Sequence, residues 1–194
     1  MSAIHEHVLQ NGMTLLCWPQ RHLHGLEFGL YLKGGPLYET EETQGISNLL
    51  EHLCFRGLGG LNREGLLREL NRFGTNLDAA TYAEGLVFRL KCLPRFFDAA
   101  LEYFLRFFAN VPWTPEQIAA EKQVVLRQLE ADGDGDLFDR AACDFRKTEN
   151  GAFPPLGTPE SLMALTEADI QLWQEMIFQP QNACLVMTGN FSDG

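Results

Sequence analysis

Residues 45–57 read GISNLLEHLCFRG, a pattern that predicts a short amphipathic helix. The helix is expected to begin at residue 45 or 46 and to end at residue 56, because glycines follow at 57, 59 and 60. Asn48 and His52 are four residues apart and therefore share one helix face, with Glu51 beside them. This face carries an amide, a carboxylate and an imidazole.

The spacing of these three side chains is that of a zinc-binding helix that has lost one ligand. In the motif H-x-x-E-H, two imidazoles four residues apart hold the metal, and the glutamate acts as the general base. Asn48 stands here at the position of the first histidine. A partial match of five residues also fits a solvated or capping helix face. Other segments of the chain have to decide between this interpretation and a degenerate zinc site.

Further segments resemble, in the same order, the pitrilysin/insulinase family of zinc metallopeptidases. They are residues 11–16 (NGMTLL), 30–39 (LYLKGGPLYE), 74–81 (GTNLDAAT) and 178–190 (FQPQNACLVMTGN). The third is expected to be a turn and departs from the family's turn pattern G-G-x-x-N-A-x-T, with Thr75 for the second glycine and Asp78 for the asparagine. Because the matches extend from about residue 11 to 190, the resemblance covers nearly the whole chain. The segments together are specific for the family, although no single segment is.

The resemblance also implies a third zinc ligand, a glutamate on a later helix within the family pattern E-R-x-V-V-x-x-E-I. The matching residues 121–129 read EKQVVLRQL, so that Glu121 keeps the first acidic position and Gln128 stands at the ligand position. The residues are seven apart, two helical turns, and are expected to share a face. Two of the three ligands are thus replaced by amides, and His52 alone is retained.

An amide oxygen is a poor zinc ligand beside an imidazole or a carboxylate, and a catalytic zinc needs three protein ligands. We therefore expect no bound metal in this chain, although zinc is the cofactor of active family members, and Glu51 becomes a vestigial general base. The Asn48 and Gln128 amides are expected to hydrogen-bond with each other or with His52. The alternative is a rearranged site in which Cys54 joins Glu51, His52 and Glu121, but Cys54 lies two residues from His52 and points to another face.

The remaining pattern predicts an α+β fold, an antiparallel sheet with helices packed mainly on one face. Strands are expected at 13–18, 26–33, 85–92 and 183–188, and helices at 62–73, 94–108, from 115 onward and at 166–177. Asn62 is expected to cap the first of these helices and Gly74 to end it, the second has a wide apolar face typical of core burial, and residues 114–117 (TPEQ) form a capping box at the start of the third. Residues 132–136 (DGDGD) resemble a calcium loop, but Leu137 replaces its glycine and Cys143 its final glutamate, so we interpret them as an acidic loop. Residues 1–194 are expected to form one domain. By resemblance, it is the N-terminal half of a longer chain with two homologous domains.

Composition excludes several classes of partner. The 194 residues carry a net charge of −11, which argues against nucleic acid and against an anionic membrane. No apolar run reaches the length of a membrane span, and the first residues do not form a secretory signal. Five dispersed cysteines without a C-x-x-C pair favour a reducing compartment. The cytoplasm is the expected location, or the periplasm if a leader has been removed.

The resemblance implies a catalytically inactive homologue of a zinc metalloendopeptidase. Such a domain or subunit would help to enclose an extended peptide beside an active homologous partner, with the peptide bound by strand addition to a sheet edge. Two alternatives remain open, an active zinc endopeptidase with altered ligands and a purely structural subunit of a larger complex.

Overall fold

β3 (Leu26–Lys33) lies at the centre of a six-stranded sheet and pairs on one side with β7 (Gly85–Cys92). The computed structural model describes residues 3–109, 112–131 and 153–191. The strand order is β1-β2-β8-β3-β7-β6, in which β1 is His5–Val8, β2 Thr14–Pro19, β6 Leu77–Tyr82 and β8 Ala183–Gly189. All pairs are antiparallel except β2 with β8, because β8 inserts between β2 and β3.

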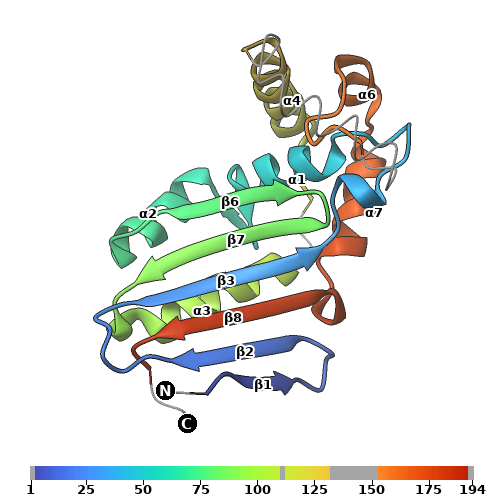
Figure 1. Ribbon diagram of the computed structural model, residues 1–194. Coiled ribbons are helices and arrows are strands. Elements are labelled where there is room, and N and C mark those ends of the chain that lie inside the picture. Colours follow the sequence, from blue (N-terminus) through green and yellow to red (C-terminus); the bar gives the residue numbers. More distant parts are fainter. Residues whose placement is uncertain (1–2, 110–111, 132–152, 192–194) are drawn as a thin grey trace.

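The helices lie mainly behind one face of this sheet (Figure 1). They are α1 (Ile46–Cys54), α2 (Arg63–Phe73), α3 (Phe97–Leu105), α4 (Pro115–Ala131), α6 (Pro159–Ala164) and α7 (Glu167–Ile177). Short 3-10 turns cover Pro36–Tyr38, Pro94–Phe96, Arg106–Phe108 and Pro180–Asn182, and Gly57–Leu58 pairs with Leu61–Asn62 as the small hairpin β4-β5. The predicted α+β fold, with helices mainly on one face, is confirmed.

Alternation along β3 explains the two layers. Phe28, Leu30 and Leu32 are buried against the helices, whereas Tyr31 and Lys33 on the other face are exposed. The core beneath is aromatic. The Phe28 and Phe104 rings lie 5.8 Å apart between centroids, and the rings of Phe88 and Phe107 lie 4.5 Å apart. The wide apolar face of the 94–108 segment is therefore core.

Local chain signals fixed several element ends as predicted. Asn62 caps α2 by accepting a hydrogen bond from the Gly65 amide, and Gly74 ends that helix in the left-handed region at φ 70°. Thr114 and Gln117 form the expected capping box, so that α4 begins at Pro115. The acidic segment 132–136 lies outside the described residues. Among the described helices, none combines the length and apolar content needed to cross a membrane.

Candidate functional site

Helix α1 presents the predicted polar face, and its beginning is held by groups from elsewhere in the chain. α1 has no side-chain cap of its own, but the Glu39 carboxylate accepts hydrogen bonds from the Gly45 amide at 2.8 Å and the Ser47 amide at 3.0 Å. The Ser47 hydroxyl accepts a further bond from Trp173 Nε1 at 3.1 Å. Burial raises the pKa of Glu39, while these amide hydrogen bonds oppose the rise. α1 is thus fixed to the preceding turn and to α7.

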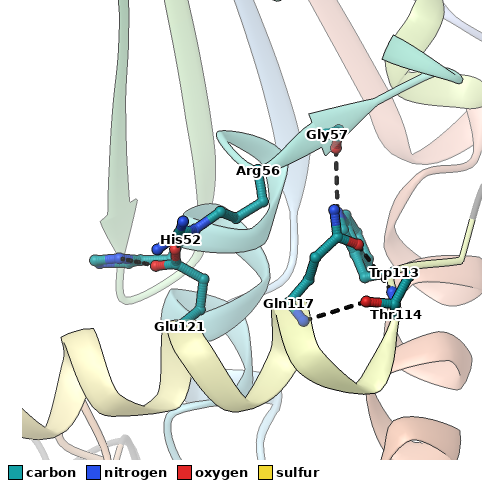
Figure 2. Close-up of polar contacts among 7 residues, drawn as sticks. All are labelled: His52, Arg56, Gly57, Trp113, Thr114, Gln117 and Glu121. Atoms are coloured by element: carbon teal, nitrogen blue, oxygen red, sulfur yellow. Dashed lines mark hydrogen bonds and ion pairs between the residues drawn. The ribbon is translucent and has the colours of Figure 1, made fainter. Parts of the chain in front are cut away.

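The structure brings His52 and Glu121 together across α1 and α4. His52 Nδ1 lies 3.3 Å from Glu121 Oε2, and Arg56 Nε donates to the other carboxylate oxygen, Oε1. Figure 2 shows the carboxylate held between the imidazole and the guanidinium. Glu121 is 5% exposed, so its charge depends on these two partners and not on water. Arg56 supplies the positive charge in this cluster.

The start of α4 is anchored near the same place. Trp113 Nε1 donates to the Gly57 carbonyl at 3.1 Å, and Trp113 is buried. In Figure 2 this contact lies beside the capping box of Thr114 and Gln117, and Gln117 precedes Glu121 by one helical turn. The register of α4 against α1 is therefore set by Trp113 at one point and by the Glu121 ion pair at another.

Glu51, the predicted vestigial base, faces the sheet edge. Its Oε2 accepts a hydrogen bond of 2.5 Å from Thr81 Oγ1 on β6. Burial raises the pKa of Glu51, against the smaller lowering effects of the Thr81 hydrogen bond and the charge of His52. Glu51 can act as a base only in its charged form, and burial makes that form less stable.

The two amide positions behave differently from each other. Asn48 is buried, and within the described part of the chain its Oδ1 has no hydrogen-bond partner. Gln128 lies two turns beyond Glu121 on α4 and is exposed, so these seven-apart residues have opposite environments. The predicted pairing through the Asn48 oxygen is therefore wrong. The side chain keeps the shape of the helix face without the hydrogen bond that we expected from it.

These donors do not fit a zinc ion. The Glu121 carboxylate is engaged by Arg56, the Glu51 carboxylate by Thr81, and the orphaned oxygen of Asn48 is a neutral amide. Among residues 3–109, 112–131 and 153–191, no three His, Cys, Asp or Glu side chains converge as a metal-binding group. Cys54 is fully buried, and burial raises the pKa of its thiol, so the rearranged site built on Cys54 has no support.

Sequence reasoning missed Arg56 and Thr81 as parts of this site. Arg56 follows His52 by four residues and so lies on the same helix face, a signal that was present in the sequence. Thr81 belongs to the segment that we expected to be a turn, but the segment forms the edge strand β6. Only the tertiary fold places that strand against Glu51.

Glu51→Gln should become increasingly stabilising, relative to the unchanged chain, as pH rises from 4.5 to 7.5. The folded pKa of Glu51 lies above its unfolded value, so the carboxyl contributes most stability when protonated and loses it as pH rises through the folded pKa. The amide keeps an acceptor for Thr81 and does not titrate. Urea unfolding at both pH values tests this, with exposed Glu84→Gln as the control for removing one negative charge. A flat or inverted difference between the variants would contradict the assigned cost of burying Glu51.

Comparison with known proteins identifies the family of this chain. The sequence profile of the insulinase family, peptidase family M16, matches residues 24–142. An uncharacterized zinc protease of Rickettsia felis is 26% identical over 185 residues, which are 94% of this chain and 45% of that protein. The mitochondrial-processing peptidase subunit beta of Caenorhabditis elegans is 27% identical over 146 residues, 74% of this chain and 32% of that one. The chain thus spans less than half the length of these relatives.

Solved structures show the same fold. A protease from Helicobacter pylori superposes with a TM-score of 0.89 at 22% identity, covering 99% of this chain and 47% of that one. A peptidase M16 inactive domain from Pseudomonas fluorescens gives a TM-score of 0.86 at 17% identity, over 98% and 47% of the two chains. At these identities the structural likeness concerns the fold, and the family follows from the profile match. The chain belongs to the insulinase family of peptidases, peptidase family M16.

Proposed function

We propose that this chain is a non-catalytic domain of an M16 peptidase, which helps to enclose an extended peptide beside a zinc-competent homologous domain or subunit. The observation that carries the proposal is the ion pair between Arg56 and Glu121. A guanidinium engages the carboxylate that faces His52, so Glu121 does not stand in for the ligand that is missing at position 128. Together with the amides at positions 48 and 128, this leaves His52 without the partners that zinc requires.

The relatives support a role beside a partner. A mitochondrial-processing peptidase subunit is by its name one part of an assembly, and a solved M16 neighbour is described as an inactive domain. The chain also spans less than half of its longer relatives, which is compatible with the first of two homologous domains. We place the protein in the cytoplasm, a proposal supported by Cys54, Cys92 and Cys184, which form no disulfide within the described part of the chain.

In this proposal the peptide binds at the sheet edge next to the degenerate metal site. β6 is the outer strand of the sheet on that side, and its Thr81 contacts Glu51. An extended peptide that paired with β6 would gain main-chain hydrogen bonds without requiring a particular sequence. Its backbone would run past His52 without meeting an activated water.

An internally quenched, fluorescently labelled extended peptide separates the proposal from its alternatives. We expect the purified chain to bind the peptide, seen as a rise in fluorescence anisotropy, and to leave it uncut. Cleavage that a chelator abolishes and His52→Ala removes would instead establish an active zinc endopeptidase with altered ligands. Absence of binding, both alone and with an M16 partner that carries an intact H-x-x-E-H motif, would favour a purely structural subunit.

A further inference from the structure

We propose that a groove at the far end of the sheet binds an acidic peptide segment of a partner protein, one that carries an apolar side chain between carboxylates. The groove has a volume of about 840 Å³. It lies where β7 and β8 end and β3 begins, beside the C-terminal end of α2 (Figure 1).

The groove is separate from the degenerate metal site. Cys92, at the end of β7, lines the groove, whereas Thr81 of the site pairs with Leu86 near the other end of the same strand. Leu86 and Cys92 lie six steps apart along the extended strand, about 20 Å. A ligand in the groove therefore touches none of the residues that replace the zinc ligands. The proposal does not rest on the proposed function.

Charge is the first argument for an anionic ligand. The chain carries a net charge of −11, yet this groove is lined by Arg72, Lys91 and Arg95 against one acid, Glu27, a local formal charge of +2 with His24 neutral. The cations come from three places: the end of α2, the end of β7 and the turn that follows it. Such a concentration on an acidic chain attracts carboxylates and steers them to this end of the molecule.

The existing ion pairs leave these cations available. Lys91 Nζ lies 3.7 Å from Glu27 and the Arg72 guanidinium lies 3.5 Å from Glu69, and in both pairs the cation is mostly exposed. Exposed pairs of this kind contribute little and exchange readily with another carboxylate. The Arg95 guanidinium lies over the Phe96 ring, 4.8 Å from its centre, which holds the charge at the groove wall.

Apolar lining argues for a peptide and against a small anion. Phe73 and Cys92 are buried at the groove, whereas Leu23 and Leu93 line it with 43% and 44% of their surface exposed. Large exposed leucines beside a concave surface favour an apolar side chain of the ligand. A nucleic acid strand would bring its phosphates past an acidic surface, which disfavours that class. An acidic peptide with an apolar anchor satisfies both parts of the lining.

The test uses a fluorescein-labelled peptide in which glutamate and leucine alternate, and a twin with lysine for glutamate, titrated with the whole chain at low and at high salt. We expect the acidic peptide alone to bind, and more weakly as salt rises. Arg72→Gln/Lys91→Gln/Arg95→Gln should weaken binding by about tenfold or more, as expected for the loss of three exposed contacts. Leu93→Ser should also weaken it.

A matched triple variant controls for net charge. Arg63→Gln/Arg68→Gln/Arg127→Gln removes the same charge from exposed positions outside the groove and should leave the affinity within about twofold. Equal losses in both triple variants, or no binding of the acidic peptide, would overturn the proposal. Competition by inorganic phosphate in the same concentration range as the peptide would also overturn it, since the groove would then be a site for small anions.

Discussion

Zinc should bind at one ion per chain when Asn48→His and Gln128→Glu are combined. The double change restores an imidazole on α1 and a carboxylate on α4 at the two positions that the family resemblance assigns to ligands, and with the retained His52 it supplies the three ligands that a catalytic zinc requires. Each single change leaves two ligands at most. We expect the double variant to bind at least about 100-fold more tightly than either single variant, because disturbing even an outer partner of a zinc ligand costs 10–100-fold. Competition with a chromophoric chelator measures all three affinities.

Two controls determine whether Gln128 is the correct position. Asn48→His/Gln123→Glu places the new carboxylate at another exposed position of α4 and should not gain zinc. If Asn48→His alone takes up one zinc and Glu121→Gln then abolishes it, the third ligand is Glu121, and the assignment of position 128 is wrong. Circular dichroism of each variant shows that the comparison concerns folded protein.

Arg56→Gln should lower the free energy of unfolding by about 2–3 kcal/mol. Removing one partner of a buried ion pair leaves an uncompensated charge, which costs about 3–5 kcal/mol when both partners are buried. The Glu121 side chain is 7% exposed but that of Arg56 is 28% exposed, so the value falls below that range. The loss should exceed that in Glu121→Gln, because an unpaired Arg56 can reach water and an unpaired Glu121 cannot. Urea denaturation at neutral pH gives both values.

Arg68→Gln provides the matched control for this measurement. Arg68 pairs with Glu64 at 3.4 Å, but both side chains are about four-fifths exposed, so the change should cost less than about 0.5 kcal/mol. The double variant Arg56→Gln/Glu121→Gln should be more stable than the sum of the two single losses indicates. Additive losses, or an Arg56→Gln loss no greater than that of Arg68→Gln, would show that the pair does not hold α1 against α4.

The elements predicted best are those whose signals are local. The alternation in β3 and β7 gave both strands with their observed bounds, and the Asn62 cap and Gly74 gave those of α2. β1 was missed because its four residues, His5–Val8, are all exposed and show no alternation. The insertion of β8 between β2 and β3 could not be predicted from the sequence either. It joins segments about 170 residues apart, and no local sequence pattern indicates such a pairing.

The candidate site shows the same division. The identity of Asn48, Glu51 and His52 and their common helix follow from residue spacing on α1. The contact of His52 with Glu121 depends on how α4 packs against α1. The same packing buries Glu121, whereas Gln128, two turns further along α4, is exposed. The role of Arg56 could not be judged from spacing alone: it is a basic residue on the site face that engages the buried acid beside His52.

The metal content of the purified chain tests the central claim most directly. After incubation with excess zinc and removal of the unbound ion, elemental analysis should find far less than one zinc per chain, and the amount should be the same in His52→Ala. One tightly held zinc per chain, lost in His52→Ala, would contradict the account, because the amides at 48 and 128 would then leave enough ligands for a metal.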